Sequence, residues 1–273
     1  MERGAASRQW ASSGSIEPDL ARPPGARETP VRDTLLLLAG LVAAWQLLSL
    51  LAGAEVLTSP LATVARLARL MADPDFPAHA SETASAFAVA LAISLAGGLL
   101  LGAALGAHRI SGEVAEPLLV ALYSIPKITL YPVVLLLFGL GMPAKIAFGA
   151  IHGVIPVALF TMNAVRSIPA VYLRAGRSMR LTPFQTFLHV LVPASLPEIV
   201  TGFRLGFSLT LLGTLIGEMF ASQRGIGHLL VRSMERNEID IIVALALLLT
   251  GLATAAGWLL LRLEQRLHAR LPS

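Results

Sequence analysis

The chain alternates long apolar segments with short polar ones. Six apolar segments contain almost no charged residue, and they are Thr34–Ala54, Ala84–Ala107, Ala115–Leu140, Ala144–Ala164, Leu196–Phe220 and Ile239–Leu261. A helix needs about 20 apolar residues to cross the hydrocarbon core of a bilayer. The pattern therefore predicts an all-α, polytopic membrane protein with six transmembrane helices.

A shorter amphipathic segment follows the first apolar span. Ser59-Pro60 is a typical helix start, with the serine as N-cap and the proline in the first turn. The residues after it form one apolar stripe, consisting of Leu61, Val64, Leu67, Ala68 and Met71. This pattern predicts a short helix that lies on the membrane surface. We expect Asp73–Pro77 to be a loop.

The first 30 residues differ from the rest, because they are rich in Ala, Arg, Gly, Ser and Pro and lack apolar periodicity. Such a composition buries too little apolar surface to fold. We therefore expect residues 1–33 to be a disordered cytoplasmic tail and residues 34–270 to form the membrane domain. Leu51–Ala54 faintly resembles a signal-peptidase site, so cleavage is an alternative. The apolar run before it exceeds the roughly 7–15 residues of a signal peptide, which favours a retained span.

Charged residues are few, and their distribution predicts the orientation. Only 14% of the 273 residues are charged, against roughly 25% in soluble domains. With the N-terminus inside, the cytoplasmic segments hold Arg3, Arg8, Arg22, Arg27, Arg32, Arg109, Arg166, Arg174, Arg177, Arg180, Arg262, Arg266 and Arg270. The outer segments hold Arg66, Arg69, Arg224, Arg232 and Arg236, together with several acidic residues. This bias fits the positive-inside rule better than nucleic-acid binding, and it predicts that both termini are cytoplasmic.

Small residues recur every fourth position in two of the spans. The first row is Ala90, Ser94, Gly98, Gly102 and Gly106, and the second is Gly202, Gly206, Thr210 and Thr214. Helices in lipid associate through close backbone approach, so such rows mark packing seams. We favour packing inside one subunit over a seam between two subunits.

Several kinds of chemical site have no motif in the chain. It contains no cysteine, which excludes disulfides and thiolate metal sites. Neither of its two lysines, Lys127 and Lys145, lies in a Gly-x-x-x-x-Gly-Lys phosphate-binding loop. The histidines form no His-Glu-x-x-His pair, and there is no Gly-x-Ser-x-Gly turn. A membrane-embedded enzyme is still an alternative, since the residues of a site can meet in space without a local motif.

Polar residues at membrane depth are costly and so are candidates for function. Lys127 lies between Pro126 and Pro132, and this predicts a bent or interrupted third span whose free backbone groups face a cavity. The candidate residues of a translocation pathway are Ser124, Lys127, Asn163 and Glu218. For Arg204 we favour a side chain that reaches to a membrane interface, and for Glu218 this interpretation and a role in the pathway are both open.

An Arg-rich amphipathic loop, Tyr172–Pro193, separates the fourth and fifth spans. Its spacing resembles the coupling loop of bacterial ABC-importer permeases, in which Glu-Ala-Ala, a glycine and a closing Leu-Pro recur. Arg174-Ala175-Gly176 stands in place of Glu-Ala-Ala, Arg180 in place of the glycine, and His189–Pro193 closes the loop. The resemblance implies a coupling loop within residues 165–195, centred on Arg174, Ala175, Gly176, Arg177, Ser178, Met179, Arg180, Leu181 and Thr182.

Two further segments carry the same resemblance. Ser124–Gly141 is similar to the third span of the sulfonate, nitrate and taurine permeases, with its two prolines and its Phe-Gly end. Gly217-Glu218-Met219 and Gly225–Leu230 are similar to the end of the fifth span and the loop after it. The family implies a fold like that of type I ABC-importer permeases, with a short cytoplasmic coupling helix.

Two positions depart from the family pattern. Glycine ends the coupling helix in the family because it takes a positive φ at low cost, and Arg180 does not. We therefore expect the helix to stop at Thr182-Pro183 instead. Arg174 also reverses a charge at the expected interface with the ATPase.

The resemblance implies a non-catalytic permease subunit in a bacterial inner membrane. Its partners would be two ATPase subunits that bind the ATP, a second permease copy, an extracytoplasmic substrate-binding protein and membrane lipid, with no nucleic acid. No cofactor or metal is expected on the chain itself. The solute would be small and organic or anionic, like a sulfonate, taurine or nitrate, and a pyrimidine-type thiamine precursor is the alternative. A membrane-embedded enzyme or a non-transporting scaffold is the alternative function.

Overall fold

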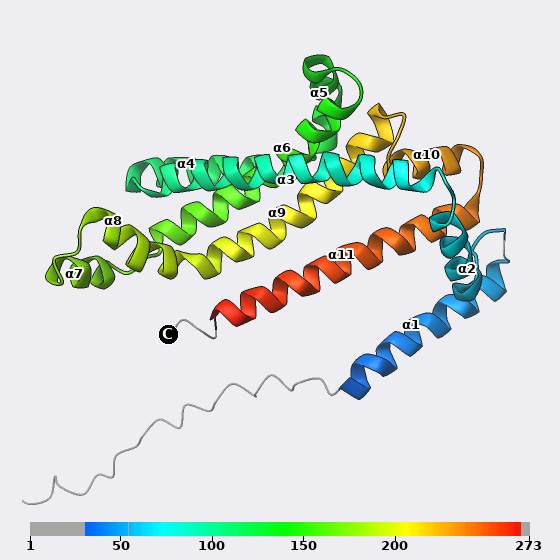
Figure 1. Ribbon diagram of the computed structural model, residues 1–273, viewed down its shortest axis with the longest axis horizontal. Helices are drawn as coiled ribbons and strands as arrows, with labels where there is room; N and C mark the ends of the chain where they lie inside the picture. Colours follow the sequence, from blue (N-terminus) through cyan, green and yellow to red (C-terminus); the bar gives the residue numbers. More distant parts are fainter. Residues whose placement is uncertain (1–30, 54, 269–273) are drawn as a thin grey trace, which may run out of the picture. The chain divides into compact units, whose positions relative to one another are not determined.

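The structure is a computed structural model that describes residues 31–53 and 55–268 (Figure 1). Most of the predicted tail, residues 1–33, lies outside the described residues. Within the described ranges the chain forms helices and turns and no strand. The elements are α1 (Val31–Ala52), α2 (Pro60–Met71), α3 (Phe76–Gly106), α4 (Arg109–Ser124), η1 (Lys127–Leu130), α5 (Tyr131–Phe138), α6 (Met142–Arg166), α7 (Ala170–Ser178), α8 (Pro183–Thr186), the π-helix η2 (Phe187–Leu191), α9 (Val192–Ala221), α10 (Ile226–Glu235) and α11 (Ile239–His268).

The predicted number of membrane spans agrees with the helices. Over the described residues, five helices are long and apolar enough to cross a membrane, and a sixth span results if one bent pair is counted as a unit. The chain divides into two compact units, one ending at Leu47 within α1 and the other beginning at Leu48. In the first unit, the leucines of α1 from Leu35 onward are mostly exposed, as expected for a helix surrounded by lipid.

The third predicted span is broken, as the two prolines indicated. Residues 110–124 and 127–138 form two helical segments bent by 86°. Ile125 is extended, with φ −65° and ψ 133°, because the ring of Pro126 disfavours the helical conformation in the residue before it. The break leaves Lys127 in a single turn of 3₁₀-helix at the corner.

The segment between the first and second spans agrees with the prediction at its start and differs at its end. The serine cap and proline start of α2 are confirmed, since Ser59 Oγ accepts a hydrogen bond from the amide of Ala62. However, α3 begins at Phe76, eight residues before the predicted start at Ala84, so the predicted loop Asp73–Pro77 is partly wrong. The hydropathy pattern missed these turns because they carry polar side chains that are used in tertiary contacts.

The core of the second unit is a stack of α3, α6 and α9 (Figure 1), in which α6 packs along both of the others. Both rows of small residues face α6, which confirms packing within one subunit. A Cβ atom on Gly98 of α3 would lie 2.5 Å from Cβ of Val157, and one on Gly202 of α9 would lie 2.6 Å from Cβ of Phe160. Real Cβ atoms essentially never approach other heavy atoms closer than 3.0 Å, so α6 leaves no room for larger residues at these positions.

Candidate functional site

The predicted coupling loop is a short helix pair, α7 and α8, between α6 and α9. The helix α7 ends at Ser178, and Arg180 follows in the left-handed conformation with φ 54°. The amide of Leu181 donates to the carbonyl oxygen of Gly176 (3.0 Å), and the amide of Arg180 donates to that of Arg177 (3.0 Å). These two bonds define a Schellman motif, with Arg180 at the position that glycine usually takes.

The expectation that the helix would stop at Thr182-Pro183 is therefore wrong, because Arg180 does adopt the positive φ. Thr182 instead begins the next helix. Its amide donates to Oε1 of Gln185 (2.9 Å), and the amide of Gln185 donates to Oγ1 of Thr182 (3.2 Å). This reciprocal pair is a capping box, in which each side chain satisfies a backbone donor that the first turn leaves free.

The helix pair presents a mixed basic and apolar surface. Arg174, Arg177 and Arg180 are exposed, as are Ala175 and Ser178. Met179 and Phe184 are 71% and 72% exposed, far more than large apolar side chains in a closed core. Gly176 is buried, facing Thr186 and Leu181. The arrangement is typical of a surface that a partner protein covers.

The predicted pathway residues lie in different surroundings. Lys127 is buried, and its Nζ donates to the carbonyl oxygen of Tyr123 (3.0 Å). The same Nζ lies 5.2 Å from the centroid of the Tyr123 ring. Ser124 is exposed and bonds the carbonyl oxygen of Val120. Asn163 is half-buried near the end of α6. Glu218 is fully buried between the helices.

These four side chains make no hydrogen bond or ion pair with one another in the described part of the chain. Among them, Lys127 lies at the helix break, where its Nζ contacts a backbone oxygen and an aromatic ring. Arg204, for which reach to an interface was favoured, pairs with Glu264 of α11 (3.4 Å) and keeps a third of its side-chain surface exposed.

A buried group of charged and hydroxyl residues was not anticipated as a site. Lys145 near the start of α6 has no exposed side-chain surface, and its Nζ lies 2.8 Å from Oε1 of Glu82 and 3.7 Å from Oε1 of Glu218. Oγ1 of Thr83 lies 2.9 and 2.8 Å from the two carboxylate oxygens of Glu218. We call Glu82, Thr83, Lys145 and Glu218 the Lys145 cluster.

The same cluster holds the loop that joins α9 to α10. Nζ of Lys145 donates to Oγ of Ser222 (3.1 Å) and to the carbonyl oxygen of Arg224 (3.4 Å). The amide of Gly227 donates to Glu218 (3.0 Å), and that of Ile226 to Oγ1 of Thr83 (2.8 Å). The amides of Ile226 and Gly227 belong to buried residues, and these contacts satisfy them.

Gly225 and His79 complete this attachment. The amide of Gly225 donates to Nδ1 of His79 on α3 (3.1 Å), so that nitrogen carries no proton. Gly225 has φ 122°, and the carboxylate of Glu218 occupies the position of a Cβ atom. Glycine is therefore required both for the backbone conformation and for the close approach of Glu218.

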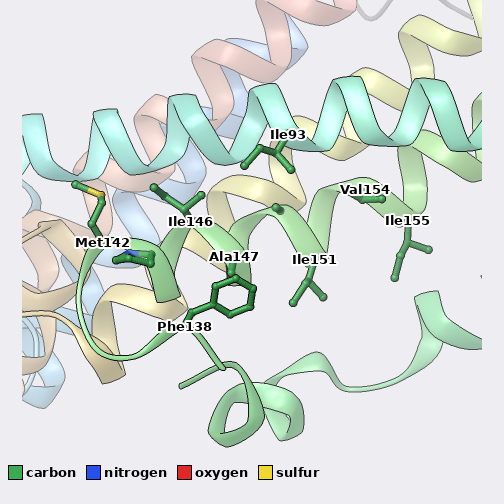
Figure 2. A pocket seen from close by; sticks show the side chains of 10 residues that line it. Ile93, Phe138, Met142, Ile146, Ala147, Ile151, Val154 and Ile155 are labelled. Atoms are coloured by element: carbon green, nitrogen blue, oxygen red, sulfur yellow. The ribbon is translucent and has the colours of Figure 1, made fainter. Parts of the chain in front are cut away.

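Two cavities near these elements differ in character. One of about 670 Å³ is lined by polar and apolar groups, namely Glu82, Leu140, Gly141, Phe220, Ser222, Gln223 and Arg224. The other, of about 690 Å³, is an apolar groove along α6, and Figure 2 shows Ile93 of α3, Phe138 of α5 and the isoleucines of α6 around it. The residues that line this groove are all apolar. Residues 31–53 and 55–268 contain no group of three or more His, Asp or Glu side chains placed to hold a metal ion.

The chain belongs to the family of binding-protein-dependent transport system inner membrane components, whose model matches residues 94–269. It is therefore a membrane permease subunit of an ABC importer. The match includes the broken third span, α6, the α7–α8 pair and α9. Of the Lys145 cluster it includes Lys145 and Glu218, and it begins after Glu82 and Thr83.

Among its relatives is the putative aliphatic sulfonates transport permease protein SsuC of Escherichia coli, which is 32% identical over 87% of this chain and 95% of the relative. The taurine transport system permease protein TauC of the same organism is 28% identical over 48% of each chain. A probable ABC transporter permease protein of Haemophilus influenzae is 29% identical over 55% of this chain, which spans 62% of that protein's length.

A solved structure supports the fold. A chain of the MetNI methionine ABC transporter, in an inward-facing conformation, superposes with a TM-score of 0.54 over 68% of this chain and 91% of the other. The sequence identity of 20% limits this likeness to the fold.

Proposed function

We propose that this chain imports a small organic or anionic solute, and that α7 and α8 are the surface on which a separate ATPase subunit acts. The observation that carries the proposal is the exposed helix pair. It follows α6 and is joined to α9 through the π-helix η2, and it presents three arginines beside Met179 and Phe184. A force that an ATPase applies to the α7–α8 pair would therefore act on both α6 and α9.

The proposed orientation follows the distribution of arginine. The α7–α8 segment and both termini would lie in the cytoplasm, with the chain in the bacterial inner membrane. The ATP would be bound and hydrolysed by two partner ATPase subunits, because this chain has no phosphate-binding loop. A second permease copy, as a homodimer, would complete the pore, and a substrate-binding protein would meet the opposite, extracytoplasmic side.

A sulfonate-like anion is the solute that we favour. Over most of its length the chain resembles SsuC, whose name refers to aliphatic sulfonates. A buried cation such as Lys127 suits an anion in an otherwise apolar passage, since a charge at membrane depth is costly unless it is paired or hydrated. A nitrate permease and a formylaminopyrimidine permease are also among the relatives, so nitrate and a pyrimidine-type thiamine precursor are the alternatives.

The absence of cysteine permits a direct test of the ATPase contact. We would place single cysteines at Ala175 or Ser178, which are exposed on α7, and at Gly251 on α11 as a control, because a Cβ atom there would have no neighbour within 4 Å. The two α7 positions should cross-link to an ATPase subunit in native membranes, and Gly251 should not. Cross-links from α7 only to extracytoplasmic proteins would refute the proposal. No association with any ATPase would favour the membrane enzyme or scaffold.

A further inference from the structure

Burying the charged side chains of the Lys145 cluster costs free energy, and this cost indicates that the cluster has a function beyond stability. Lys145 and Glu218 have no exposed side-chain surface. Each buried ion loses its hydration, and well-packed apolar residues of similar size often give equal or greater stability. Stability alone therefore does not account for a lysine and two carboxylates here. Unlike apolar packing, the hydrogen bonds of the cluster are directional. They therefore fix the position of the groups that they contact.

The cluster fixes the Ser222–Gly227 loop. Side chains from α3, α6 and α9 supply its partners, and the loop contributes mostly backbone groups. The carbonyl oxygen of Arg224 faces Lys145, and the amides of Ile226 and Gly227 face Thr83 and Glu218. Backbone contacts of this kind set where the loop lies and leave its outward side chains free. Gln223 and Arg224 are exposed next to the 670 Å³ cavity.

We propose that Lys145 and Glu218 are positioning residues that hold the Ser222–Gly227 loop in the conformation to which the substrate-binding protein docks. The inference rests on the proposed function, which places this end of the stack outside the cytoplasm. Lys145 touches three elements, namely α3 through Glu82, α9 through Glu218 and the loop through Ser222. A docked protein that displaces the loop therefore acts on the start of α6 through a single side chain.

The test uses the assembled permease and ATPase in lipid nanodiscs, with ATP hydrolysis measured against the concentration of the purified binding protein of the same system. Lys145→Met keeps most of the length and removes the charge. We expect the half-saturating concentration of binding protein to rise at least about tenfold, because the loop is no longer held, while the maximal rate is largely kept. An unchanged half-saturating concentration would overturn the proposal.

Arg204→Met is the control, because it also breaks an ion pair of α9, the one with Glu264 on α11. It is expected to leave the half-saturating concentration as it is in the parent. A nitroxide on Gln223→Cys gives a readout without binding protein, since the chain has no other cysteine. Its spectrum should become more mobile with Lys145→Met and not with Arg204→Met. Equal mobility in both variants would assign the pair a purely structural role.

Thr83 provides milder variants if Lys145→Met does not assemble. Thr83→Val removes the hydroxyl that joins Glu218 to the amide of Ile226, and Thr83→Ser keeps it. The valine variant should raise the half-saturating concentration and the serine variant should restore it. Identical behaviour of the two variants would refute the positioning role. A parent complex that no binding protein stimulates would instead refute the proposed function.

Discussion

The amide of Leu181 donates to the carbonyl oxygen of Gly176 across the end of α7, at 3.0 Å. Between them Arg180 takes a left-handed conformation that side chains with a Cβ atom adopt at a cost of roughly 1–2 kcal/mol. The hydrogen bond therefore closes the helix in the manner of a glycine-terminated helix, with the larger residue under strain. In return, the position carries an exposed arginine side chain on the surface of the α7–α8 pair, where glycine would carry none.

Replacing Arg180 by glycine should relieve the strain. We expect Arg180→Gly to stabilise the end of α7 by about 1 kcal/mol, which slows hydrogen exchange of the Met179 and Leu181 amides roughly fivefold. Arg177→Gly is the control, since Arg177 has helical geometry within α7 and glycine there should speed exchange. Faster exchange in Arg180→Gly would mean that the arginine side chain itself holds the turn.

The exposed arginines of α7 should matter for assembly and not for folding. Reversing Arg174 and Arg177 to glutamate is expected to release the ATPase subunit during affinity purification, with the amount of membrane-inserted permease unchanged. The matched control reverses Arg262 and Arg266, two exposed arginines near the end of α11. Retention of the ATPase by the Arg174 and Arg177 variant would contradict the docking role.

Lys127 should control passage of an anion. Lys127→Met removes the charge and is expected to reduce uptake of a small alkanesulfonate into vesicles at least about tenfold, because the cation no longer offsets the solute's charge at membrane depth. Lys127→Arg should retain part of the uptake. Tyr123→Phe is a control that keeps the ring and the carbonyl oxygen to which Lys127 donates. Uptake at the parental rate by Lys127→Met would leave the lysine with a structural role.

The stack should tolerate no enlargement along its seams. Gly98→Leu inserts a side chain where Val157 already lies, and it should destabilise the subunit by about 1–3 kcal/mol or more. Gly251→Leu makes the same change on α11, where a Cβ atom would have no neighbour within 4 Å beyond the local helix backbone, and should be neutral. Thermal denaturation of the detergent-purified protein separates the two. Equal melting temperatures would show that α3 and α6 separate easily.

Local patterns in the sequence predicted most of the helices. The proline pair around Lys127 predicted the break, the Ser59-Pro60 cap predicted the start of α2, and the rows of small residues predicted the stack. Each of these signals lies within one element. Their physical causes are the ring of proline, which disfavours a helical conformation in the residue before it, the capping of free backbone donors and the volume of side chains.

The Lys145 cluster was missed because its partners are remote in the sequence. Lys145 and Glu82 are 63 positions apart, and Thr83 and Glu218 are 135 apart. The only available signal was complementary charge at the margins of apolar spans, which does not define a pairing by itself. Arg180 was misjudged for a different reason. The cost of a positive φ was correct, but two backbone hydrogen bonds offset it.

The tight contact of α6 with α3 and α9 has a mechanical consequence. The facing positions of α3, α6 and α9 lack room for one more methyl group, so these helices cannot slide past one another. We therefore expect the three helices to tilt together as one rigid body, which we call the lever. The α7–α8 segment is attached to one end of this lever, through α6 and α9, and the Ser222–Gly227 loop is attached to the other. A movement of the α7–α8 segment is therefore transmitted to the Ser222–Gly227 loop, and the reverse, without a change in how the three helices pack.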